Sequence, residues 1–204
     1  MIKIKFCGMT RNEDALAAAE LGVNAIGLIF YSKSPRAVDS DQAKKVIQGL
    51  PASIIKVGVF VNASFAEVKS VLDQLSLDWL QFHGNESPEF CRNFHVPYIK
   101  VVRMKNDVDF KDYAKHYHDA KALLLDAYLE NTPGGTGKTF AWNLVPKDFS
   151  IPIILAGGLK ANNVRAAIAK VHPDMVDVVS GIEATPGIKD YDKMAQFVDA
   201  VKEK

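Results

Sequence analysis

The chain has 204 residues, 48% hydrophobic and 24% charged, which is the composition of an ordinary globular protein with a sizeable core. Its formal net charge of +1 gives no electrostatic footprint for nucleic acid or for an acidic membrane surface. The two cysteines, Cys7 and Cys91, have no metal-ligand spacing, so we expect no disulfide framework, no metal site and a reducing, cytoplasmic setting. No apolar run reaches the ~18 residues of a membrane helix, and no signal-peptide core is present.

Short apolar runs typical of β-strands recur along the whole chain. Eight such runs are spaced so that each interval has room for one helix and two loops. They cover residues 2–8, 25–30, 54–61, 79–84, 98–104, 122–128, 151–158 and 175–181. The first run ends in Cys7 and Gly8, which indicates a strand followed by a tight turn at a thiol.

Helix signals occupy the intervals between these runs. Apolar residues at helical spacing predict helices over residues 43–50, 164–171 and 194–201. Capping boxes are predicted where Thr10 precedes Glu13 and where Ser64 precedes Glu67. The weakest helix signal lies between the sixth and seventh runs, where turn-forming residues dominate.

Eight strand–helix units with near-constant spacing favour an α/β fold of the (β/α)8 barrel type. The alternative is an open doubly wound sheet, but the first strand lacks a G-x-G-x-x-G signature and the chain shows no second domain. Without a linker or low-complexity tract, we expect residues 1–204 to form a single barrel domain.

Chemistry in such a barrel collects at the carboxyl ends of the strands. The reactive side chains expected at this mouth are Cys7, Arg36, His83 and Asp126. The seventh and eighth strands end in small residues whose backbone N–H groups suit a phosphate, namely Gly157, Gly158, Ser180 and Gly181. A helix N-terminus close to Cys7 is expected to stabilise its thiolate and to lower its pKa from the usual ~8.5.

Each of these residues also has a purely structural interpretation. Cys7 alone fits a small buried hydrophobe, Asp126 a turn cap, Arg36 a solvated loop residue and His83 a hydrogen-bonded structural histidine. The stretch TPGGTGKT at residues 132–139 is close to a P-loop, but a threonine stands where the motif needs its first glycine. We therefore expect an active-site loop there and no nucleotide cradle.

Stretches along nearly the whole chain resemble the phosphoribosylanthranilate isomerase family of tryptophan biosynthesis. They are KFCGMT from Lys5, GLIFYSKSPR from Gly27, VGVFVN from Val57, QFHG from Gln81, LLLDA from Leu123, GGTGKTF from Gly134, LAGGL from Leu155 and DVVSGIE from Asp177. The resemblance implies a (β/α)8 barrel and a cofactor-free Amadori rearrangement. The substrate would be N-(5-phosphoribosyl)anthranilate and the product 1-(2-carboxyphenylamino)-1-deoxyribulose 5-phosphate.

The resemblance also implies roles for the residues at the mouth. Cys7 would be the general base, Asp126 the general acid and Arg36 the ligand of the anthranilate carboxylate, with His83 near the substrate. Gly157, Gly158, Ser180 and Gly181 would hold the phosphate. The expected partner is thus a small phosphorylated substrate, and the expected assembly is a monomer or a homodimer.

Two positions depart from the family pattern, which usually has serine at Val179 and aspartate at Ala141. We expect weaker phosphate binding or a different loop anchor there, with the chemistry intact. Rival hypotheses are another sugar-phosphate barrel enzyme and a non-catalytic barrel that binds a phosphorylated ligand. The former would typically carry a metal cluster, a lysine or paired carboxylates at the mouth.

Overall fold

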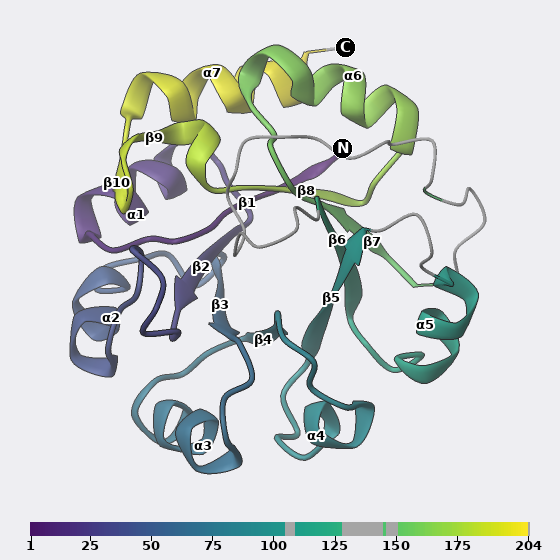
Figure 1. Cartoon of the computed structure of the whole chain (residues 1–204). Helices are drawn as coiled ribbons and strands as arrows, with labels where there is room; N and C mark the ends of the chain where they lie inside the picture. Colours follow the sequence, from purple (N-terminus) through teal and green to yellow (C-terminus); the bar gives the residue numbers. More distant parts are fainter. Residues whose placement is uncertain (105–108, 128–144, 146–150, 204) are drawn as a thin grey trace.

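A computed structural model describes residues 1–104, 109–127, 145 and 151–203 of the chain. Eight parallel strands pair in consecutive order, and the last pairs with the first to close a barrel (Figure 1). The strands are β1 (Lys3–Phe6), β2 (Ala25–Ile29), β3 (Ile55–Phe60), β4 (Trp79–Phe82), β5 (Tyr98–Met104), β6 (Ala122–Ala127), β7 (Ile153–Leu155) and β8 (Met175–Val178). Each lies within one of the eight predicted runs, which confirms the (β/α)8 barrel.

Helices surround the barrel, and all those described except the last connect successive strands (Figure 1). They are α1 (Asn12–Glu20), α2 (Ser40–Val46), α3 (Phe65–Gln74), α4 (Pro88–Arg92), α5 (Phe110–His116), α6 (Ala161–Val171) and α7 (Tyr191–Lys202). Among these described helices, none is long and apolar enough to cross a membrane. The loop expected at residues 132–139, the weak helix signal beside it and the departure at Ala141 all lie outside the described residues.

The two predicted capping boxes have different outcomes. Ser64 and Glu67 form a complete capping box at the start of α3. The prediction at Thr10 and Glu13 is wrong, because α1 has Arg11 as its N-cap and begins at Asn12. The Thr10 hydroxyl instead donates a hydrogen bond to the Gly187 carbonyl, in the turn of a small hairpin near the C-terminal end of the chain.

Both faces of the barrel strands are buried. On the outer face of β1, Ile4 and Phe6 pack in a core shared with the helices, and the Phe6 ring lies 6.0 Å from that of Phe197 on α7. The inner face holds a separate apolar cluster. Its members are Ala25, Val57, Ile99, Val101, Ala122, Leu124, Ile154, Ala156 and Met175. This inner cluster is the floor beneath the mouth of the barrel.

After β8 the chain forms the 3-10 helix η2 (Ser180–Ile182) and a small hairpin of β9 (Glu183–Thr185) and β10 (Ile188–Lys189). Figure 1 shows this hairpin beside α1, on the same side of the barrel as the carboxyl end of β1. Hydrogen bonds from Lys189 to Cys7 and from Thr10 to Gly187 fasten the hairpin there. The hairpin therefore becomes part of the site described next.

Candidate active site

Strand parity decides which side chains reach the mouth of the barrel. Successive residues of a strand point to opposite faces, so every second residue points inward. Leu124 of β6 belongs to the inner cluster, and Asp126 follows on the same face. Trp79 of β4 packs against the same cluster, so Gln81 and then His83 lie above it.

Asp126 and His83 lie together, as the sequence led us to expect of residues at one mouth. His83 Nε2 lies 3.2 Å from Asp126 Oδ2, and the side chains are 23% and 13% exposed. On the other side of the ring, His83 Nδ1 lies 3.2 Å from Nε2 of Gln81. With the Gln81 amide nitrogen donating to Nδ1, the tautomer that fits both contacts carries its proton on Nε2 and donates it to the Asp126 carboxyl. Gln81 thereby orients the histidine that contacts the predicted acid.

Cys7 follows directly on β1 and is buried. A methyl group added at Gly27 of the neighbouring strand would lie 2.4 Å from the Cys7 sulfur, so only glycine leaves room for the thiol. Lys5, two residues before Cys7, is fully buried and makes a 3.0 Å ion pair with Asp177 of β8. Lys5 and Asp177 are register partners across the β1–β8 pairing.

The predicted direction of the Cys7 pKa is wrong. Burial raises the pKa of the thiol above its ordinary value, the charge of Lys5 lowers it in part, and the charge of Asp177 raises it. The expected helix does not reverse this, because α1 begins only at Asn12 and the thiol is buried. The positive charge that favours the thiolate therefore comes from a lysine of the same strand.

Asp177 interacts electrostatically with residues on both sides of the site, Cys7 and Lys5 of the first strand segment and Asp126 of β6. Its pKa is raised first by burial, is lowered by the charge of Lys5 and is raised again by the charge of Asp126. Burial lowers the pKa of the Lys5 ammonium group, but the charges and hydrogen bonds of Asp177 and Cys7 together raise it above its ordinary value, so the lysine keeps its charge. Cys7 and Asp126 thus share one electrostatic environment across the ends of β1, β8 and β6.

Arg36 lies in the loop between β2 and α2, where its guanidinium is held by Glu183 of β9. Arg36 Nε and Nη2 donate to the two carboxylate oxygens of Glu183 over 2.8 and 2.6 Å. The stem of Arg36 runs across Gly8, where an added methyl group would lie 2.8 Å from the Arg36 Cδ. Gly8 also has a φ of +71°, a conformation that favours glycine.

The glycine-rich ends of β7 and β8 lie against each other. Gly157 and Gly158 both have positive φ and precede α6, whose Asn163 donates a 3.0 Å hydrogen bond to the Gly158 carbonyl. A methyl group on Gly181 of η2 would lie 2.0 Å from the Leu159 carbonyl oxygen, so glycine is needed for this close approach. Backbone turns beside the start of a long helix are well suited to an anion.

Sequence reasoning did not assign roles to several charged and polar residues of the site. They are Lys5, Gln81, Asp177, Glu183 and Lys189. The sequence held one signal for Lys5, Gln81 and Asp177, since a charged or amide side chain at an inward position of a barrel strand needs a buried partner. The partners of these residues come from distant segments of the chain, and they became evident only in the closed barrel of the structure.

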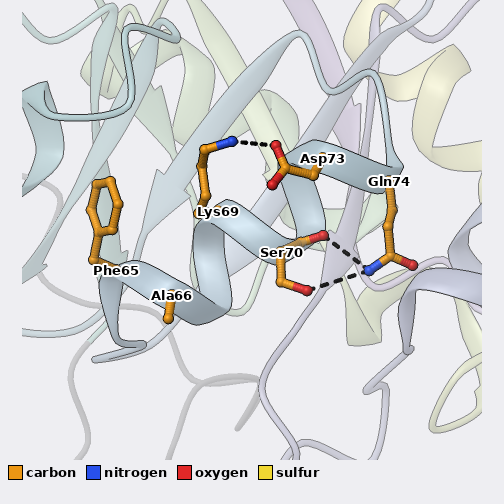
Figure 2. Close-up of a pocket in the computed structure, with 6 residues that line it drawn as sticks. All are labelled: Phe65, Ala66, Lys69, Ser70, Asp73 and Gln74. Carbon is orange, nitrogen blue, oxygen red and sulfur yellow. Dashed lines mark hydrogen bonds and ion pairs between the residues drawn. The ribbon is translucent and has the colours of Figure 1, made fainter.

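A depression on the outer surface of α3 is separate from this mouth (Figure 2). It is lined by Phe65, Ala66, Lys69, Ser70, Asp73 and Gln74. Figure 2 shows Lys69 paired with Asp73, and Gln74 bonded to Ser70 one turn earlier along the helix. Its polar groups are therefore engaged with one another, and none of the predicted site residues lies there.

Comparisons with known proteins agree over almost the whole chain. A family model described as N-(5′-phosphoribosyl)anthranilate isomerase matches residues 4–200. The relative of that name from Pseudomonas syringae pv. tomato is 53% identical, over 98% of this chain and 97% of its own length.

Two solved structures show the same likeness. One is a phosphoribosyl anthranilate isomerase in complex with reduced 1-(o-carboxyphenylamino)-1-deoxyribulose 5-phosphate, with TM-score 0.88, 36% identity and 99% of each chain covered. The other, from Thermotoga maritima, is described as monomers generated from a dimeric phosphoribosylanthranilate isomerase, with the same TM-score, identity and coverage. The similarity thus extends to both sequence and fold.

Proposed function

The chain belongs to the N-(5′-phosphoribosyl)anthranilate isomerase family, and we propose that Cys7 is the general base and Asp126 the general acid of its reaction. The reaction converts an aldose into a ketose, from N-(5-phosphoribosyl)anthranilate to 1-(2-carboxyphenylamino)-1-deoxyribulose 5-phosphate. The observation that supports these roles is the placement of an acid and a thiol at the ends of β6 and β1, with Asp177 and Lys5 between them.

The first step opens the furanose ring. Asp126 donates its proton to the ring oxygen as the bond from C1 to that oxygen breaks, and the anthranilate nitrogen lone pair forms a C1=N double bond. His83 Nε2 donates to Oδ2 of Asp126, so the proton for transfer is held on the other carboxyl oxygen. The acid is thus oriented by one oxygen while it reacts through the other.

The second step forms the ketose. The iminium nitrogen acidifies the C2 proton, which the Cys7 thiolate removes, and the electron pair of that C–H bond forms a C1=C2 double bond as nitrogen regains its lone pair. The resulting enol becomes the C2 ketone when C1 takes a proton from the Cys7 thiol and the hydroxyl on C2 gives its proton to the Asp126 carboxylate, which restores both groups. Burial makes the Cys7 thiolate costly, and the buried ammonium of Lys5 compensates for part of that cost.

Binding groups at the two ends of the substrate complete the proposal. Arg36 binds the anthranilate carboxylate, while the turns at Gly157, Gly158, Ser180 and Gly181 bind the phosphate. The test is consumption of the fluorescent anthranilate adduct by the purified protein. Turnover is expected, and binding of the product without turnover would favour the rival non-catalytic barrel.

We further propose that residues 1–204 act as one catalytic domain in the cytoplasm. Both cysteines are free and buried, which suits a reducing compartment. Size-exclusion chromatography with light scattering tests whether the assembly is a monomer or a homodimer. A heterogeneous or higher assembly would contradict this part of the proposal.

A further inference from the structure

The carboxylate of Glu183 binds the guanidinium of Arg36 along one edge. Nε and Nη2 each donate to a different carboxylate oxygen, and the Arg36 and Glu183 side chains are only 11% and 4% exposed. A guanidinium presents five N–H donors in a rigid plane, and this contact uses one of its two bidentate edges. The edge formed by Nη1 and Nη2 is the other edge that fits a carboxylate.

We infer that Glu183 is a positioning residue, which holds Arg36 by the Nε edge so that the Nη1–Nη2 edge receives the anthranilate carboxylate. This inference rests on the proposed function of Arg36. It assigns to the β9–β10 hairpin a part in recognising the aromatic acid end of the substrate.

The carboxylate of Glu183 is itself fixed by two further contacts within the hairpin. Its Oε1 accepts hydrogen bonds of 3.1 Å from the Gly187 N–H and from Lys189 Nζ. Lys193 donates over 2.8 Å to the Glu183 carbonyl. Burial raises the pKa of Glu183, but the hydrogen bonds and charges of Arg36, Lys189 and the Gly187 N–H together lower it below its ordinary value, so the carboxylate stays ionised.

Lys189 links this positioning contact to the catalytic end of β1. The side chain is fully buried, and its Nζ donates over 2.7 Å to the Cys7 carbonyl and over 3.3 Å to the Val179 carbonyl. The stem of Arg36 meanwhile lies against Gly8, the next residue after Cys7. The position of the Arg36 guanidinium is therefore fixed relative to the backbone of Cys7, the proposed general base.

The variant Glu183→Gln tests the inference at a single contact. With its carbonyl oxygen in place of Oε1, the glutamine keeps the bonds from Arg36 Nε, Gly187 and Lys189. Its NH2 group then faces Arg36 Nη2, so the second bond of the fork is lost. We expect product affinity, measured by fluorescence titration, to fall on the order of ten-fold.

A ligand without the carboxylate separates positioning from general damage. The probe is 1-phenylamino-1-deoxyribulose 5-phosphate, the aniline analogue of the product. Glu183→Gln is expected to bind this analogue as well as the parent protein does. Equal losses of affinity for product and analogue, or product binding that is unchanged or tighter in Glu183→Gln, would overturn the inference.

Two further variants distinguish the inference from the function on which it rests. If Arg36→Met does not weaken product binding, the proposed role of Arg36 fails. If Arg36→Met weakens binding and Glu183→Gln does not, only the inference about Glu183 fails. The double variant should bind product as Arg36→Met does, because Glu183 acts through Arg36.

Lys193→Met is the matched control in the same segment. It removes the hydrogen bond to the Glu183 backbone but leaves the bonds of the carboxylate in place. Product affinity is expected to match that of the parent protein. A loss as large as that of Glu183→Gln would show that the hairpin as a whole, and not the carboxylate fork, sets the affinity.

Discussion

His83 Nε2 lies 3.2 Å from Asp126 Oδ2, while the opposite ring nitrogen faces the Gln81 amide at the same distance. This arrangement makes the proposed general acid the end of a three-residue chain. Gln81 is buried, and its carbonyl oxygen has no hydrogen-bond partner among the described residues. The contact with His83 is thus the hydrogen bond of the Gln81 side chain at this site, and in this orientation of the amide the ring proton belongs on Nε2.

Replacing Gln81 by leucine should weaken the acid without removing it. The His83 ring loses the donor at Nδ1, so both tautomers become accessible and the contact with Asp126 is less well defined. We expect kcat to fall about ten-fold, as for the loss of one positioned hydrogen bond, with KM unchanged. Steady-state kinetics measure this effect, and an unaltered kcat would show that the Gln81 contact has no catalytic consequence.

Cys7→Ala should remove the general base. We expect kcat to fall by about 10²–10⁴, the usual contribution of a positioned acid or base, with little change in KM. The measurement is steady-state turnover of the anthranilate adduct, with product affinity as the control for an intact site. A kcat within a few-fold of the parent value would show that Cys7 is only a small buried residue.

The charges around Cys7 should move its titration in opposite directions. Lys5→Met removes the ammonium that favours the thiolate, so the pKa of Cys7 rises and the limb of the kcat/KM profile that Cys7 controls moves to higher pH. Asp177→Asn removes a negative charge that raises the same pKa, so that limb moves to lower pH.

The pH dependence of kcat/KM in both variants measures this effect. Each variant disrupts a buried ion pair, which costs stability of about 3–5 kcal/mol, so profiles are recorded well below each unfolding temperature. Shifts in the same direction for both variants would contradict the assignment of that limb to Cys7.

The barrel could be predicted from the sequence because the patterns that indicate its strands lie within short stretches of the chain. Each strand is an apolar run with turn residues at its ends, and the reactive residues follow those runs directly. Asp126 after three leucines and Cys7 before Gly8 are both visible in the printed chain. Closure of the barrel then places such strand ends at one mouth, whatever the details of packing.

The partners within the site were not predictable, because they are set by contacts between distant segments. Arg36 and Glu183 are separated by 147 residues, and Lys5 and Asp177 by 172. Apolar and charged residues alternate in β1, a pattern that in a sheet with one solvent-exposed face would place the charged residues in water. In this barrel Lys5 points inward instead and is fully buried. The error in the Cys7 pKa has the same origin, since local spacing gives no measure of burial.

The most direct test of the account is Asp126→Asn, measured for turnover and for product affinity together. Asparagine keeps the shape of the side chain and accepts from His83, but it cannot deliver a proton to the ring oxygen. We predict that turnover is abolished while the product, held at its carboxylate and phosphate, binds as before. Normal turnover would remove Asp126 from the mechanism, and loss of binding together with turnover would show that its role is structural.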